Sequence, residues 1–192
     1  LNGHDAVIGN LETAVARDFA VPRLPREPAI LRYNSPPELV TSFRRPDGRS
    51  TFTALTLANN HAMDCGVLGA AQTAELLARE GIAHTGTRAG GDAADHVVFN
   101  VRGIRVGLCA ATWGLSNRRE LASQVRQVAS LAPLPGEPLD IEPIRAALDA
   151  MGRAGAEFKI VAVHWGYEYE MYPDARIMQM ARQIVQAGAD LV

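Results

Sequence analysis

Side chains that can bind metal ions gather at three places in the sequence, each directly after an apolar run. They are amides, imidazoles and carboxylates, which suit Mn, Fe, Zn or Mg and do not suit a cysteine-rich structural zinc site. The residues are Asn10, Glu12, Asn59, Asn60, His61, Asp64, His164 and Glu168. Because ligands in open α/β sheets bind at the carboxyl ends of the strands, side chains from separate strands can converge there. The pattern predicts a polar, metal-binding site at the strand ends.

Each of these residues also has a purely structural interpretation when it is taken alone. An asparagine after a strand, such as Asn10, is often a turn residue. His61 could enter a helix with its ring bonded to the backbone, and Asp64 could cap the helix that follows. His164 could be a core histidine with satisfied hydrogen bonds, and Glu168 could be a loop carboxylate. The coincidence of three such clusters favours a common site over separate structural roles.

Short apolar runs rich in Val, Ile and Phe predict the strands that carry these clusters. The expected strands cover 5–9, 52–58, 96–101, 104–111, 158–164 and the beginning of another at 189–192. The pair Arg102-Gly103 between two of these runs indicates a tight antiparallel hairpin. Apolar residues at helical spacing predict helices over 67–81, 142–152 and 173–188. The alternation of strands and helices predicts an α/β layered domain with a mixed sheet.

Length and charge limit the classes of protein to consider. The 192 residues fit one domain over 1–192, and a hydrophobic fraction of 47% is enough for a sizeable core. A net charge of −2 gives no electrostatic reason to expect nucleic acid or an anionic membrane surface as partner. No apolar run approaches the roughly 20 residues that cross a bilayer. The chain begins at Leu1 and ends in a partial strand, so we expect an interior piece of a longer protein.

Other polar residues and the proline-rich stretches are expected to have supporting roles. Two stretches with several prolines, 13–37 and 112–140, predict long loops of the kind that often carry function. Cys65 and Cys109 lack metal-type spacing, so we expect them to be buried small hydrophobic residues. The other histidines are expected to be structural or exposed; they are His4, His84 and His96.

Four segments together resemble the CapA-type family of poly-γ-glutamate capsule-synthesis proteins, which is related to the calcineurin-like metallophosphoesterases. The segments are GNLE at 9–12, LANNHAMDCG at 57–66, GIAHTG at 81–86 and VHWGYEYEMYP at 163–173. ANNHxxDxG together with HWGxEY is a specific combination, and the resemblance continues to the last residue. It implies a metallophosphatase-like, layered α/β/β/α sandwich with mixed sheets, which this chain would leave incomplete at both ends.

The resemblance also implies which residues bind metal. Asn60 and His164 match positions that supply metal ligands in such enzymes. The aspartate that bridges two metals there corresponds to Asn10, which is neutral and would bridge two cations poorly. Glu12 could supply the missing charge, or the site could hold one metal. We therefore expect these four residues to bind a divalent Mn, Fe or Zn, weakly or not at all in this chain alone, because further ligand motifs of the family would lie outside it.

The remaining site residues would take part in catalysis or support it. His61 matches the family's general acid or transition-state stabiliser and would donate a proton to the leaving group. Asp64 would orient His61, as carboxylates commonly orient functional histidines. Asn59 and Glu168 are expected to contact the substrate or to hold the ligands in place.

Two functional hypotheses follow from these residues and the resemblance. In the first, a CapA-like protein of poly-γ-glutamate capsule biosynthesis or export uses a metal-dependent hydrolase-type site on a phosphorylated or amide substrate. In the second, the chain is a non-catalytic module that binds an anionic polymer, with Arg17, Arg23 and Arg26 as candidate contacts. The family typically works at the membrane or outside the cytoplasm, through parts beyond this chain, and a cytoplasmic location stays open.

Overall fold

Among the described residues, the first of two β-sheets consists of three short parallel strands. In the computed structural model, which describes residues 3–20, 32–87, 95–116, 140–166 and 169–192, these strands have the order β1-β2-β3. They are β1 (Ile8–Asn10), β2 (Ala54–Thr56) and β3 (Ala83–Thr85). All three residues of β2 are buried. Because the strands are parallel, the polar residues that follow β1 and β2 leave the sheet at the same edge.

The second sheet is mixed and has longer strands in the order β4-β5-β6. β4 (His96–Val101) and β5 (Ile104–Thr112) form an antiparallel hairpin, and β6 (Phe158–His164) runs parallel to β5. The hairpin turn places Arg102 and Gly103 at positive φ, which is the geometry expected of a two-residue turn. The last residue pair between β5 and β6 is Thr112 and His164, so His164 lies at the carboxyl end of both strands.

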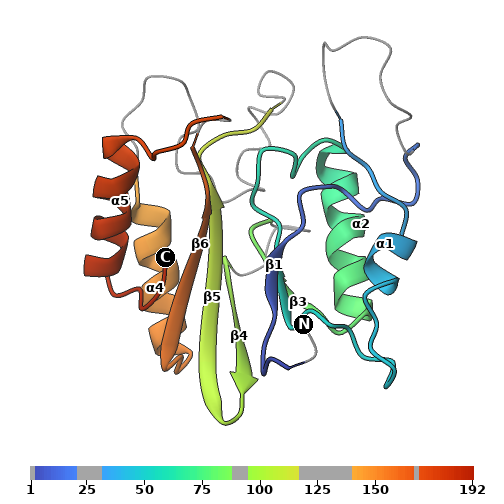
Figure 1. The fold of residues 1–192 in the computed structure, drawn as a ribbon, viewed down its shortest axis with the longest axis horizontal. Helices are drawn as coiled ribbons and strands as arrows, with labels where there is room; N and C mark the ends of the chain where they lie inside the picture. Colours follow the sequence, from blue (N-terminus) through green and yellow to red (C-terminus); the bar gives the residue numbers. More distant parts are fainter. Residues whose placement is uncertain (1–2, 21–31, 88–94, 117–139, 167–168) are drawn as a thin grey trace.

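Helices cover the outer face of each sheet, which gives four layers (Figure 1). α1 (Glu38–Thr41) and α2 (Gly66–Arg79) lie outside the first sheet, and α4 (Glu142–Arg153) and α5 (Ala175–Gln186) lie outside the second. This arrangement confirms the expected α/β/β/α layering. The second sheet is mixed, as expected, whereas the three described strands of the first are all parallel. Within the described residues, no helix has the length and apolar character required to span a membrane.

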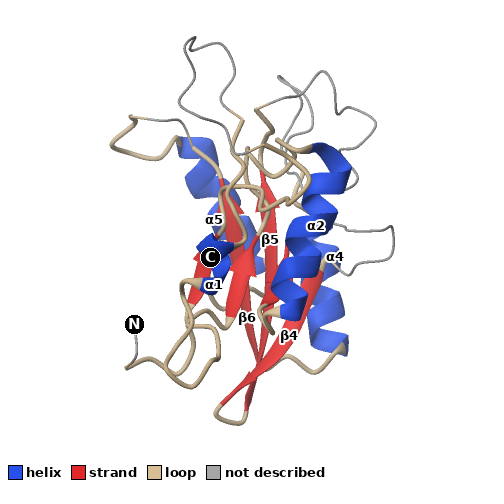
Figure 2. Ribbon diagram, turned by 90° about the vertical axis from the view of Figure 1, so that its right-hand side faces the viewer, coloured by secondary structure: helices blue, strands red, loops and turns tan. Residues whose placement is uncertain are grey.

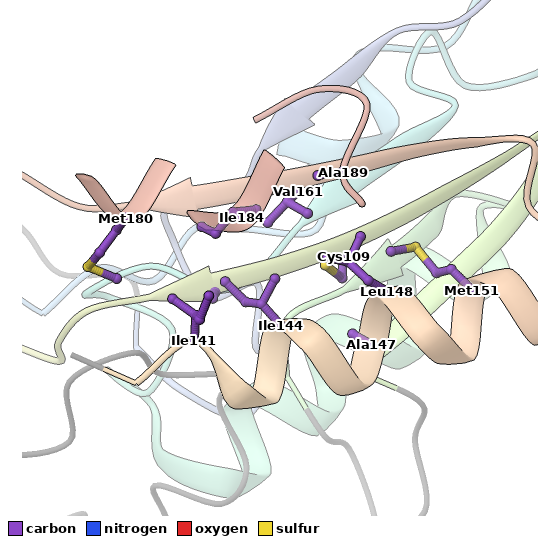
Figure 3. Packing of buried hydrophobic residues seen from close by; sticks show 11 residues of the cluster. Cys109, Ile141, Ile144, Ala147, Leu148, Met151, Val161, Met180, Ile184 and Ala189 are labelled. Atoms are coloured by element: carbon purple, nitrogen blue, oxygen red, sulfur yellow. The ribbon is translucent and has the colours of Figure 1, made fainter. Parts of the chain in front are cut away.

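Two apolar clusters attach the helices to the sheets. The larger one joins α4 and α5 to β5 and β6, and Figure 3 shows side chains of both helices meeting those of the strands. Its fully buried members include Leu148, Met151, Val161 and Ile184. The other cluster packs α2 against β2 through residues such as Leu55 and Leu77. These contacts explain why the 3.6-residue periodicity of the helices was readable in the sequence.

A third, smaller cluster connects the two halves of the molecule near the polar strand ends. Met63, Ala70 and Leu115 are buried together, with Ala62 and Val67 packed against them. Met63 precedes α2 and Leu115 follows β5, so the cluster joins the segments that leave β2 and β5. The cluster therefore restricts how the two sheets can move relative to each other at this end.

Most sequence-predicted elements are confirmed with shifted boundaries. The strands 96–101 and 158–164 match β4 and β6, whereas β1 and β2 are shorter than the apolar runs that predicted them. Leu191 forms an isolated parallel bridge to Ile160, in agreement with a strand beginning at 189–192. β3 and the short helix α1 were not predicted, because three or four residues are too few to show a period.

Gly86 lets the chain after β3 approach the chain after β2. Its φ of +109° is unfavourable for other residues, and a Cβ at this position would meet the backbone nitrogen of Ala58 and lie 2.8 Å from the Ala58 Cβ. Ala58 immediately precedes the Asn59-Asn60-His61 segment. Close packing at Gly86 therefore helps to set the position of that segment.

Gly86→Ala should lower the free energy of unfolding by at least about 2 kcal/mol, since it combines backbone strain with a steric clash. Gly152→Ala is the matched control, because Gly152 lies inside α4 and a Cβ added there would meet no atom within 4 Å. That control should raise stability by about 0.5–1 kcal/mol through helix propensity. Urea unfolding measures both, and equal effects of the two substitutions would contradict the close contact at Gly86.

Candidate metal and catalytic site

The polar residues that follow the strands converge at one end of the molecule. Figure 1 shows the β4–β5 hairpin at the opposite end, and Figure 2 shows the same strands from the side. Hydrogen bonds at this end connect residues that follow β2 with the last residue of β1, with a residue that follows β5 and with the last residue of β6. The expected convergence of Asn10, Asn59, Asn60 and His164 is therefore present in the structure.

Asn59 connects the end of β1 to the turn that follows β2. Its side-chain amide group donates to the Asn10 Oδ1 atom at 3.1 Å and to the Leu11 carbonyl oxygen at 2.9 Å. Its Oδ1 atom accepts a hydrogen bond from the backbone N–H of His61 at 3.1 Å. Asn59 is completely buried, so these bonds satisfy an amide that has no access to water. They fix the starting geometry of the segment that carries Asn60 and His61.

Three atoms that could coordinate a metal ion lie close together beside this amide, and we call them the donor group. The Nε2 atom of His164 is 3.0 Å from the Oδ1 atom of Asn60 and 3.6 Å from the Oε1 atom of Glu12. The side chains of His164 and Glu12 are 33% and 44% exposed, so this group of atoms opens to solvent on one side. His164 is thus not the satisfied core histidine that its sequence context also allowed.

The two separations measured from His164 Nε2, to Asn60 Oδ1 and to Glu12 Oε1, match those between ligands of a single metal ion. Two ligands bonded to one ion at about 2.1–2.2 Å lie about 3.0–3.6 Å apart at bond angles between tetrahedral and octahedral values. The set of one imidazole nitrogen, one amide oxygen and one carboxylate suits Mn, Fe or Zn. Groups of three or more His, Cys, Asp or Glu side chains that could hold a metal are absent from the described part of the chain.

Asn10 contacts the donor group through Glu12. Its Oδ1 atom accepts hydrogen bonds from Asn59 and from the Thr56 hydroxyl, the latter at 3.4 Å, and its amide nitrogen donates to Glu12 at 3.4 Å. Asn10 is the last residue of β1, and its φ is not positive, so it is not a turn residue. The structure therefore places the Asn10 amide nitrogen beside the Glu12 carboxylate, and the expected role of Asn10 as a metal ligand remains a prediction.

His61 and Asp64 form a buried pair next to Asn60. The Nδ1 atom of His61 is 2.7 Å from the Oδ2 atom of Asp64, whose side chain is 1% exposed. Asp64 does not cap α2, because Cys65 is the N-cap residue and makes no side-chain capping bond. Since Nδ1 is engaged by the carboxylate, any proton that His61 exchanges with a substrate would pass through Nε2.

Tyr33 is a neighbour of this pair that the sequence did not reveal. Its backbone N–H donates to the Oδ2 atom of Asp64 at 2.6 Å, and its ring lies 4.1 Å from the His61 ring. The next residue, Asn34, is buried and bonds to the backbone of Ala16 and Phe19. The contact to Asp64 comes from the backbone, so no residue type in the sequence could have signalled it.

Several predicted residues fall outside the geometry just described. Glu168, Arg23 and Arg26 lie outside the described residues. Arg17 is described and lies 3.9 Å from Asp18, with 58% of its side chain exposed. The expected roles of these residues in ligand or polymer binding therefore remain predictions.

The two cysteines are not paired with each other and do not belong to the donor group. Cys109 is buried in the larger core cluster, as predicted, whereas Cys65 is only half-buried. Burial raises the pKa of the Cys109 thiol to about 12, and burial also raises the pKa of the Cys65 thiol. Neither residue therefore offers a thiolate at neutral pH.

Comparison with a solved structure gives a partial match. The 5′-nucleotidase precursor from Thermus thermophilus is similar over 68% of this chain and 24% of that chain, with a TM-score of 0.41 and 21% sequence identity.

Comparisons with protein families and curated proteins agree on one family. The family model described as "Bacterial capsule synthesis protein PGA_cap" matches residues 1–192. The chain is 31% identical over 144 residues to the capsule biosynthesis protein CapA of Bacillus anthracis, covering 73% of this chain and 33% of that protein. It is 32% identical over 144 residues to the PGA biosynthesis protein CapA of Bacillus subtilis (strain 168), covering 73% and 35%. The chain spans about a third of the length of these relatives. It belongs to the bacterial capsule synthesis family that includes the CapA proteins.

Proposed function

We propose that this chain carries a divalent-metal site and an adjacent proton donor for a hydrolytic step on a phosphorylated or amide substrate during poly-γ-glutamate capsule synthesis or export. Family membership supports the capsule role, because both curated relatives are named for capsule or PGA biosynthesis. The geometry at the strand ends supports the chemical step.

One observation carries the proposal. Glu12, Asn60 and His164 come from three separate segments and two different sheets, yet His164 Nε2 lies 3.0 Å from Asn60 Oδ1 and 3.6 Å from Glu12 Oε1, which suits ligands of one ion. Bringing a carboxylate, an amide oxygen and an imidazole together without a ligand would gain little stability at a partly exposed site. Their convergence is therefore better explained by binding than by folding.

Different residues of the chain would bind the ion and transfer the proton. A bound divalent ion lowers the pKa of a coordinated water molecule and polarises a phosphoryl or carbonyl oxygen. His164, Asn60 and Glu12 would hold the ion, with Asn10 orienting the Glu12 carboxylate through its amide group. His61 would donate a proton to the leaving group from Nε2, while Asp64 keeps the ring in place through Nδ1.

Binding of an anionic polymer without catalysis is the competing function. The donor group contains one carboxylate, and Asn10 is neutral at the position where the resemblance to metallophosphoesterases implies a bridging aspartate. A single negative charge holds a divalent ion less firmly than two or three would. A metal-free wild-type protein that binds poly-γ-glutamate would support this second function and contradict the first.

Elemental analysis of the complete protein, purified without chelator, tests the metal site. We expect about one equivalent of Mn, Fe or Zn in the wild type and a loss of most of it in His164→Ala, because that variant removes the imidazole ligand. His4→Ala is the matched control, since His4 is an exposed histidine outside every strand. Equal metal content in all three proteins would contradict the role of His164.

Two substitutions of His61 separate its chemical role from its structural one. His61→Asn keeps a nitrogen that can donate to Asp64 but removes Nε2, so hydrolysis should fall about 10²–10⁴-fold with metal content unchanged. His61→Ala also leaves the buried Asp64 carboxylate without its ring partner, and should cost about 1–3 kcal/mol of stability in addition.

The rates would be measured with a phosphodiester, bis(p-nitrophenyl) phosphate, and an amide, γ-glutamyl-p-nitroanilide. Urea unfolding of both variants supplies the stability comparison. A His61→Asn protein that keeps wild-type turnover would show that His61 does not transfer a proton. If His61→Asn lowers the free energy of unfolding as much as His61→Ala does, the hydrogen bond to Asp64 does not account for the stabilising effect of the His61 ring.

A further inference from the structure

Ser116 makes two hydrogen bonds to Asn60, one to its backbone and one to its side chain. The backbone N–H of Ser116 donates to the Asn60 carbonyl oxygen at 2.9 Å. The Ser116 Oγ atom accepts a hydrogen bond from the side-chain nitrogen of Asn60 at 3.0 Å. Ser116 follows β5, whereas Asn60 follows β2, so these bonds connect the two sheets directly beside the donor group.

We propose that Ser116 is a positioning residue that holds the Asn60 amide with its oxygen toward the metal position; this inference rests on the proposed function. A primary amide has an oxygen that can coordinate a cation and an NH₂ group that cannot. Because the NH₂ group donates to Ser116, the Oδ1 atom is directed to the other side, where it lies 3.0 Å from His164 Nε2. Rotation of the amide by half a turn would instead present NH₂ to the ion.

The segment that carries Ser116 is itself fixed at several points. Leu115 is buried against Met63 and Ala70, in the cluster that joins the segments leaving β2 and β5. The Thr112 hydroxyl donates to the carbonyl oxygens of Gly114 and His164, at 3.0 and 3.2 Å. Ser116 is therefore held in place independently of its own side chain, and its hydroxyl oxygen lies where it accepts a hydrogen bond from the Asn60 amide nitrogen.

Removal of the hydroxyl should isolate its effect on the amide. In Ser116→Ala, the backbone hydrogen bond to Asn60 remains, and only the acceptor for the Asn60 NH₂ group is lost. Ser116 is exposed, so water can replace the hydroxyl in part. We therefore expect a loss of metal affinity at the lower end of the 10–100-fold range typical of residues that orient metal ligands, about tenfold.

The experiment measures the Kd for Mn²⁺ by electron paramagnetic resonance on the complete protein and its variants. Ser116→Ala should bind about tenfold more weakly, and Ser116→Thr, which keeps a hydroxyl, should stay within about threefold of the wild type. Ser42→Ala is the matched control: Ser42 is also exposed and its hydroxyl bonds to a backbone carbonyl, that of Leu39, outside the site. It should leave the affinity unchanged.

An Asn60→Asp background tests the orientation mechanism itself. A carboxylate presents an oxygen whichever way it is turned, so Ser116→Ala should change the Mn²⁺ affinity less than about twofold in this background. A tenfold loss in both backgrounds would mean that Ser116 does not act through amide orientation, and would overturn the proposal.

The results distinguish this inference from the function on which it rests. If the wild type binds Mn²⁺ and Ser116→Ala binds it as tightly as Ser42→Ala does, the role of Ser116 is wrong and the proposed metal site stands. If the wild type binds no Mn²⁺, the proposed function fails and the role of Ser116 fails with it.

Discussion

The buried amide of Asn59 connects the end of β1 with the turn that starts after β2. An amide that is 0% exposed must find all of its partners inside the protein, because an unsatisfied polar group there costs about 1–3 kcal/mol. Asn59 finds them in Asn10, in the Leu11 carbonyl and in the His61 backbone N–H. Those bonds determine where Asn60 and His61 leave the first sheet. The positions of the candidate ligand and the candidate proton donor thus follow from one satisfied side chain.

The second constraint is that two separate sheets must end at the same place. Glu12 and Asn60 follow strands of the first sheet, whereas His164 ends a strand of the second. The contact between Asn60 and His164 is maintained by packing around Leu115 and by the hydrogen bonds of Thr112 and Ser116. A site built across two sheets is sensitive to their relative position, so these contacts matter for function as well as for stability.

The sequence predicted the helices and strands that are long enough to show an apolar pattern. The periodicity of α4 and α5 and the apolar runs of β4, β5 and β6 are extensive enough to be read directly. β3 and α1 are too short for that, and they form because neighbouring elements pair with them or pack against them. The meeting of the clusters after β1 and β2 was also predictable, since neighbouring parallel strands end on the same side of a sheet. That His164 joins them from the other sheet depends on how the two sheets pack together.

The finer structure of the site depended on contacts that leave no pattern in the sequence. Asp64 resembled a helix cap because it stands just before α2, yet its carboxylate binds His61 and the backbone N–H of Tyr33. Ser116 belongs to an irregular segment after β5, and its importance comes from a partner 56 residues away in the sequence. Such pairings are set by tertiary packing, which local sequence does not specify.

The central claim is that Glu12, Asn60 and His164 share one divalent ion, and anomalous diffraction from crystals of the complete protein grown with Mn²⁺ tests it most directly. The account predicts one anomalous peak within about 2.5 Å of His164 Nε2, Asn60 Oδ1 and a carboxylate oxygen of Glu12. A peak bonded to other residues, or the absence of any peak beside these three side chains at saturating Mn²⁺, would contradict it.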